Sequence, residues 1–206
     1  MGSKGNRAGS WLAFLALLGA AIAGILYLRR LERAEERFVP LPPSLEAVRR
    51  PVERAVDPEA ASIAAVPLPT TLKEIRSMLR PAELGENRLG VADHRVAPLE
   101  THIWTLRAKV KEAEIRADND LYLVIEEGGI GGCAELPDPK LCKGSPFQKQ
   151  IEAVRAQIDK ELHPSRSPLP VGRDAELTGI GYFGTAGKLD NGARLMPLLR
   201  IRWLDR

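Results

Sequence analysis

The sequence predicts a small α+β domain, mainly β, that follows one membrane-spanning helix and a proline-rich linker. Three observations predict it. Residues 11–28 carry no charge, prolines recur between residues 40 and 69, and after residue 100 apolar and polar residues alternate at the period of a strand. The expected organisation is an N-terminal tail at 1–10, an anchor at 11–28, a juxtamembrane segment and linker at 29–70, and a domain at 71–206.

The anchor reads WLAFLALLGAAIAGILYL. At 1.5 Å per residue this helix is about 27 Å long, close to the roughly 30 Å hydrocarbon core of a bilayer. Trp11 and Tyr27 lie at its two ends, where amphipathic rings favour the interface, and Arg29 ends the run. A cleaved signal peptide is the alternative, but its small residues would follow the apolar run rather than lie inside it. We therefore expect membrane lipid to contact Trp11–Leu28.

The direction of insertion rests on weaker signals. Cations follow the helix more often than they precede it, which favours a cytoplasmic C-terminus. A short N-terminal tail with Lys4 and Arg7 is also the form of a signal anchor that exports the following chain. The two cysteines, and a resemblance given below, favour export. The expectation is a single-pass inner (plasma) membrane protein with its domain on the extracytoplasmic side.

The domain shows five strand-like stretches and one long helix. The strands are expected at 101–115, 120–127, 133–136, 171–183 and 193–204, with Trp203 on the core face of the last one. The helix lies between the third and fourth strands, with Ser145 as N-cap, Gln148 in a capping box and an apolar stripe that ends at Leu162. This element order is that of a five-stranded OB-like barrel, and a small α+β sandwich is the alternative. A short helix is also expected at 71–79.

Five sequence blocks occur in a characteristic order. They are LRAKVKEAEIRADNDLYLVIEE, AELPDP, SPFQKQIEAVRAQID, ELTGIGYFG and NGARLMPLLRI. Together they resemble an uncharacterised bacterial domain family, often exported, with DGDxHLVL, AEIPDP, VTGVGFFD and NGIELHPVL blocks. The chain departs from that family at Tyr122, Gly184 and Met196, which replace His, Asp and His. The resemblance implies no activity, and any polar site built on those positions would be degraded here.

The candidate ligand surface is defined by polar residues around the second, third and fourth strands. It consists of Asp118, Asp120, Tyr122, Glu135 and Tyr182. With Glu126 and Glu127, the three acids could instead hold a divalent ion, as in a metal-dependent phosphodiester hydrolase with a nuclease-like OB barrel. Turn and strand-end positions explain the same acids without a metal. We predict neither a metal nor another cofactor.

The sequence allows two interpretations of Cys133 and Cys142. They could form a disulfide in an oxidising compartment, or they could be two unpaired buried thiols. No second cysteine pair and no nearby histidine completes a zinc ligand set.

Composition limits the function classes. Residues 100–206 hold equal numbers of acidic and basic residues, so the net charge of +3 lies in the N-terminal half and argues against nucleic-acid binding. The GIGYFGTAG stretch lacks a P-loop lysine and fits a bent strand better than a phosphate loop. The functional hypothesis is a membrane-tethered, non-catalytic binding or structural module with an unknown protein or small-ligand partner. The alternatives are the hydrolase and an oligosaccharide- or oligonucleotide-binding barrel.

Overall fold

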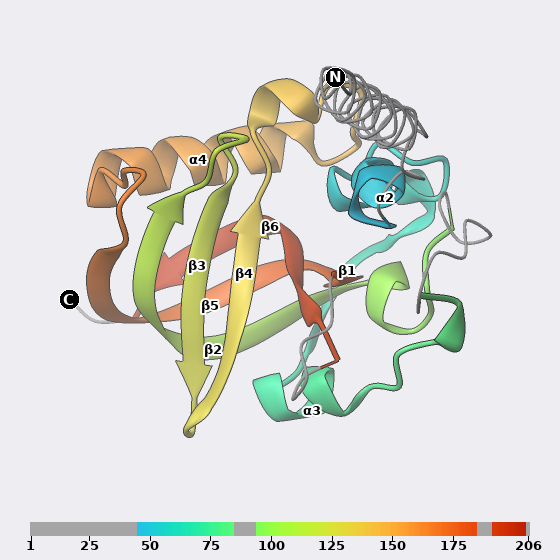
Figure 1. Cartoon of the computed structure of the whole chain (residues 1–206), viewed down its shortest axis with the longest axis horizontal. Coiled ribbons are helices and arrows are strands. Elements are labelled where there is room, and N and C mark those ends of the chain that lie inside the picture. The colour runs from blue at the N-terminus through green and yellow to red at the C-terminus, as the bar shows by residue number, and fades with distance from the viewer. Residues whose placement is uncertain (1–44, 85–93, 185–190, 205–206) are drawn as a thin grey trace, which may run out of the picture. The chain divides into compact units, whose positions relative to one another are not determined.

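A computed structural model gives the structure of residues 45–84, 94–184 and 191–204. Its helices are α2 (Leu45–Glu53), α3 (Leu72–Ser77) and α4 (Gln148–Leu162), and its strands are β1 (Ala64–Pro69), β2 (His102–Ile115), β3 (Leu121–Glu127), β4 (Ile130–Leu136), β5 (Leu169–Phe183) and β6 (Ala193–Trp203) (Figure 1). The expected domain is therefore confirmed as mainly β and of the α+β class, with its long helix between the third and fourth of the predicted strands.

The six strands form one mixed sheet that returns on itself. Its order is β1-β2-β3-β4-β6-β5, and β5 also pairs with β2, so that five of the strands close into a ring. The closure between β4 and β6 is parallel and rests on the pair Ala134–Leu195, whereas the other pairings within the ring are antiparallel. β1 adds to the outside of the ring by parallel pairing with the start of β2.

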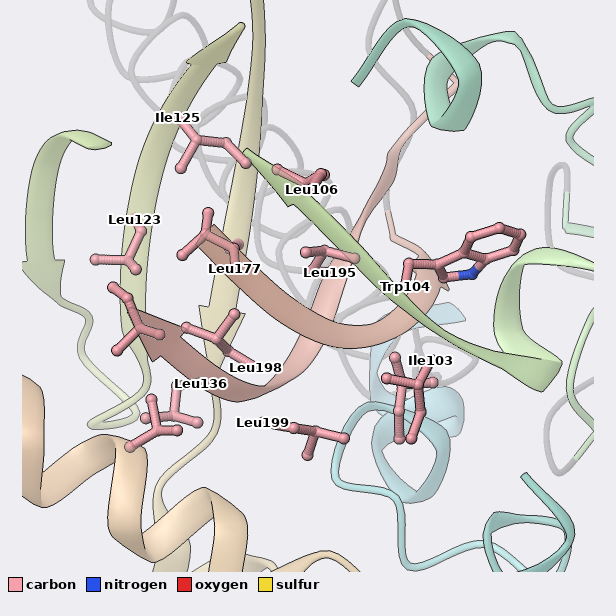
Figure 2. Packing of buried hydrophobic residues seen from close by; sticks show 14 of the residues in the cluster. Ile103, Trp104, Leu106, Leu123, Ile125, Leu136, Leu177, Leu195, Leu198 and Leu199 are labelled. Carbon is pink, nitrogen blue, oxygen red and sulfur yellow. The ribbon is translucent and has the colours of Figure 1, made fainter. Parts of the chain in front are cut away.

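The interior of the ring is filled by the apolar positions of the alternating strands. Leu123 and Ile125 of β3, Leu177 of β5 and Leu198 of β6 are completely buried, and Figure 2 shows these side chains between the strands. Since neighbouring residues of a strand point to opposite faces, this core also decides which polar residues face outward. Trp203 is only partly buried at the edge of the core, where the Arg173 guanidinium lies 4.2 Å from its ring centroid.

Two glycines allow β5 to bend. A Cβ at Gly181 would lie 2.3 Å from the carbonyl oxygen of Leu99, and one at Gly179 would lie 2.9 Å from that of Pro197. The β5–β6 register shifts at these two positions. At both positions any side chain would push the backbone of a neighbouring segment away, so these glycines permit the close approach of that backbone.

α4 begins two residues later than the sequence suggests, because its N-cap is Phe147 rather than Ser145. Ser145 does not cap the helix, because its Oγ accepts a hydrogen bond from the backbone N–H of Phe147, and the Gln148 side chain accepts one from Gly144. The serine thus stabilises the turn before the helix. Ile151, Val154 and Ile158 are buried as the apolar stripe predicts. A true capping box occurs instead at α3, between Thr71 and Glu74.

The expected linker over 29–70 is wrong for residues 45–69. α2 forms there although it contains Pro51, and β1 forms although it contains Pro67 and Pro69. The backbone N–H of Thr70 donates to Thr105 of β2, so the nitrogen of Pro69 faces the free edge of β1, where the missing donor costs nothing. These prolines also remove donors that a further strand would need, which protects an exposed edge.

Buried ion pairs hold α2 and the following segment against the sheet. Arg49 donates to Glu100 at 2.5 Å with both side chains fully buried, and Glu100 also accepts the backbone N–H groups of Val96 and Phe183. Arg95 binds Asp57 through two nitrogens, at 3.0 and 2.5 Å. Glu100 is therefore a single carboxylate that joins α2, β5 and the segment before β2.

Within the described residues, no helix has both the length and the apolar character needed to cross a membrane. The predicted anchor at 11–28 and the tail at 1–10 lie outside the described residues.

We expect Glu100→Ala to destabilise the protein by about 3–5 kcal/mol, because Arg49 would remain buried without a counter-charge. Urea unfolding of the full chain measures this change. The matched control is Lys111→Met, which breaks the exposed Lys111–Glu126 pair and should cost less than about 1 kcal/mol. Equal losses of unfolding free energy in the two variants would show that Glu100 is not the required counter-charge of Arg49.

Outer face of β3 and β4 as a candidate functional site

Tyr122 and Glu135 are brought together by strand alternation. Leu121 and Leu123 are fully buried in the ring, so Tyr122 between them faces outward. Tyr122 and Glu135 are direct partners in the antiparallel β3–β4 ladder. The structure thus brings two of the predicted ligand residues onto one surface, although they lie in different strands.

Arg116 covers the Tyr122 ring from the end of β2. Its guanidinium carbon lies 3.7 Å from the ring centroid, which is a close cation–π contact, and Arg116 itself is exposed. Burial, followed by the nearby Cys133 and Glu135, raises the pKa of Tyr122 to about 12. At neutral pH the Tyr122 phenol keeps its proton, and its flat ring lies against the Arg116 guanidinium.

Arg194 of β6 forms an ion pair with Glu135 of β4, and both side chains are largely buried. The pair bridges the strands that close the ring. Gly184 makes room for it, because a Cβ at that position would lie 2.2 Å from Nη2 of Arg194 and 2.4 Å from its Cζ. Gly184 is thus coupled in space to this arginine. We call Arg116, Tyr122, Cys133, Glu135 and Arg194 the outer strip.

The two cysteines are free thiols, so the disulfide reading does not hold in the structure. The Cys133 thiol faces the Glu135 carboxylate at 3.9 Å, whereas the Cys142 thiol faces the backbone carbonyl of Asp138 at 3.6 Å. Burial raises the pKa of both thiols, that of Cys142 to about 12. Both thiols stay protonated at neutral pH, a state in which they are poor nucleophiles.

The loop between β2 and β3 is fixed by carboxylates. Asp120 is buried and accepts the backbone N–H of Asp138 at 2.7 Å, and Asp138 in turn accepts from the Asn119 side chain at 2.8 Å. Burial, with smaller contributions from Asp118 and Glu135, raises the pKa of Asp120 to about 6. Asp118 is exposed, and its carboxylate accepts the N–H of Asp120 at 3.3 Å.

The acids proposed for a metal site have separate partners. Glu126 pairs with Lys111, Glu127 accepts the backbone N–H of Leu72 at 2.5 Å, and Glu135 pairs with Arg194. In the part of the chain that the structure describes, no three His, Cys, Asp or Glu side chains form a group that could hold a metal ion. The geometry of these residues gives the hydrolase reading no support.

Tyr182 is not available to a ligand. It is 2% exposed, its hydroxyl donates to Glu53 of α2 at 3.0 Å, and its ring packs with Val52 and Met196. Burial and the Glu53 carboxylate raise its pKa. The sequence identified an outward strand position correctly but could not show that α2 covers it. Met196 shares this covered patch.

An apolar hollow lies elsewhere in the described residues. It is a pocket of about 230 Å³ between β1, α4 and the β5–β6 ladder, lined by Ile103, Phe147 and Leu199 with Gln150 and Arg200 at its polar part. Typical small-molecule sites enclose roughly 300–1,000 Å³ and gather several convergent polar groups. We therefore place the candidate site on the outer strip, where Arg116 is exposed and Tyr122 is partly buried, rather than in this hollow.

Sequence reasoning missed both arginines of the outer strip. Arg116 follows the last residue of β2 and looks like an ordinary turn cation. Arg194 could be connected to Glu135 only by knowing that β4 and β6 are neighbours, because 58 residues separate them in the chain.

Comparison with known proteins finds no family model that matches the chain and no curated protein similar to it.

Asp120→Asn should stabilise the protein at neutral pH. The folded pKa of Asp120 lies above its unfolded value of about 3.8, so its favourable contribution is complete below pH 4 and disappears as pH rises through 6. We expect the variant to gain about 1–3 kcal/mol at pH 7.5 and nothing at pH 4, because Asn can still accept from Asp138. Urea unfolding at both pH values, with exposed Asp118→Asn as the control, measures this. A gain independent of pH would contradict the assignment.

Gly184→Ala should displace Arg194 and destabilise the protein by about 1–3 kcal/mol, because Glu135 would be left buried and unpaired. In an Arg194→Ala background the same substitution has no guanidinium to meet. It should then stabilise slightly, by about 0.4–1 kcal/mol, through the unfolded chain. The change of sign in this double-mutant cycle, measured by urea unfolding, is the test, and additive effects would refute the coupling.

Proposed function

We propose that this protein is a membrane-tethered, non-catalytic binding module whose domain is an OB-like barrel and whose ligand contacts the outer strip. The main support for this proposal is that two features occur together: the strand topology of the sheet and the side-chain chemistry of the outer strip. β2, β3, β4, β5 and β6 follow the order and pairing of OB-fold strands one to five, with a parallel closure between the third and the fifth. Three residues of the outer strip lie on the second and third of these strands, and Arg116 and Arg194 adjoin them from the end of β2 and from β6.

In OB folds the face of the second and third strands, with the neighbouring loops, binds oligonucleotides and oligosaccharides. Here that face offers the Tyr122 ring, the exposed Arg116 and the buried Glu135–Arg194 pair. Analogy with other OB folds indicates only where a ligand would bind. The class of ligand must be inferred from the side chains at that position. They suit a polar chain that stacks on one ring and hydrogen-bonds to one guanidinium.

Arg116 is the group through which a ligand gains access to Tyr122. Leaving the ring costs an exposed cation–π contact of about 0.5–1 kcal/mol, and the guanidinium is then solvated. Arg194 cannot leave in the same way, since Glu135 would stay buried without its partner. Binding would therefore exchange the Arg116–Tyr122 contact for a ligand contact while the Glu135–Arg194 pair keeps the strands in place.

The uncharged run at 11–28 supports the tether, and the resemblance to exported bacterial domains supports an extracytoplasmic domain in the inner (plasma) membrane. A protein or small-ligand partner on that side is part of the proposal. The even charge balance after residue 100 remains the argument against nucleic acid.

The test is site-specific photocrosslinking of the full chain in membranes of its native host. A benzophenone amino acid replaces Val124, which faces outward beside Cys133, or the exposed Lys149 of α4 as the control position. We expect a discrete adduct from position 124 only, in the membrane fraction, and its loss when Tyr122→Ser is added. Mass spectrometry of the adduct identifies the ligand class. Full-length chain in the soluble fraction, or identical adducts from both positions, would overturn the proposal.

A further inference from the structure

Three arginines on the opposite side of the ring surround one carboxylate. Arg107 of β2, Arg200 and Arg202 of β6 approach the Glu176 carboxylate of β5 at 3.5, 3.4 and 3.0 Å. Arg107 and Arg202 are the two ladder partners of Glu176, on either side of it. We call Arg107, Arg200 and Arg202 the arginine face.

The arginine face keeps a positive charge that Glu176 does not balance. One carboxylate neutralises one of three guanidiniums, and the next row, Lys109 opposite Asp174, is balanced in itself. The arginine side chains are 71%, 59% and 57% exposed, whereas that of Glu176 is 14% exposed. Exposed ion pairs contribute little to stability and like charges on adjacent positions oppose it, so folding gives no reason for this arrangement.

The chemistry of the face suits phosphate groups on a flat surface. A guanidinium presents a planar set of donors that matches phosphate oxygens, and here three of them converge from two strands of one sheet face. The adjoining positions Thr105 and Thr178, of which Thr178 is buried, carry hydroxyls hydrogen-bonded to each other at 2.9 Å. Single-stranded nucleic acid is held by aromatic rings placed between cations, and these two positions offer none.

We propose that the arginine face docks on anionic phospholipid headgroups of the membrane that holds the chain. This inference rests on the proposed tether at 11–28. Residues 29–44 lie between that run and α2, and fully extended they reach on the order of 50 Å. A folded unit of this size has a radius of gyration of roughly 15 Å, so the tether lets any of its faces reach the lipid. Charge then selects the arginine face, and the outer strip on the other side of the ring stays open to its ligand.

The experiment measures arginine modification in the full chain reconstituted into nanodiscs. Phenylglyoxal reacts with exposed guanidiniums, and peptide mass spectrometry gives a rate for each arginine. In phosphatidylcholine discs with about 30% phosphatidylglycerol, we expect Arg107, Arg200 and Arg202 to react roughly threefold slower than in pure phosphatidylcholine discs. The protection should vanish at about 0.5 M salt, since screening shortens the range of the attraction. Exposed Arg116 on the outer strip serves as the internal control and should not change.

Two double variants distinguish an effect of the arginine face from an effect of the total net charge. Arg107→Gln with Arg202→Gln should return Arg200 to its rate in phosphatidylcholine discs, while the exposed pair Lys143→Gln with Arg166→Gln should leave its protection intact. Disc-bound chain with equal arginine rates in both lipids overturns the docking and leaves the tether standing. Chain that does not remain with the discs overturns the tether, and the docking with it. Protection by an added oligodeoxynucleotide but not by phosphatidylglycerol would show that the arginine face binds nucleic acid rather than lipid.

Discussion

The closure of the sheet depends on β2, which pairs along both of its edges. One edge meets β5 from Ile103 to Ala113, and the other meets β1 first and β3 afterwards. A strand in this position must curl, and the register shift between Val110 and Glu112 allows it to do so. Once β2 and β5 are paired, alternation assigns every neighbouring side chain to the core or to an outer face. The outer strip and the arginine face are both consequences of that assignment.

Closure of the sheet also explains why the buried Glu100 carboxylate is tolerated at the C-terminal end of β5. Where β5 ends at Phe183, Glu100 accepts the Phe183 N–H and receives Arg49 from α2. Among the residues that the structure describes, none hydrogen-bonds to Nε or Nη1 of Arg49, so this pair is not an optimised stabilising device. We expect its effect to be specification of where α2 docks. The cost of separating these charges makes any other position of α2 unfavourable, which fixes the cover over Tyr182.

Local signals in the sequence were sufficient for the elements after residue 100. The alternation in β2 and the stripe Ile151–Val154–Ile158 define their own element types, because burial of one face is a property of the period itself. The predictions failed where the determinant is distant in the chain. α2 contains Pro51 and is held by Glu100, and Arg194 finds Glu135 only because β4 and β6 are neighbours. From sequence alone, a proline predicts the end of a helix or strand. Only the structure shows that it lies at a sheet edge or near the end of an element, where it is tolerated.

The two outer faces differ in how their charges are satisfied, and this difference argues for different partners. On the outer strip, Glu135 and Arg194 neutralise each other within a largely buried pair, and the ring of Tyr122 is covered by a single exposed guanidinium. Such a surface has little net charge to attract a distant partner, so its selectivity must come from short-range stacking and hydrogen bonds. On the arginine face the charge is exposed and unbalanced, and it acts over a Debye length without a shaped pocket. The proposed lipid layer would match the second face, whereas the proposed ligand of the first would have to displace Arg116 and lie against Tyr122.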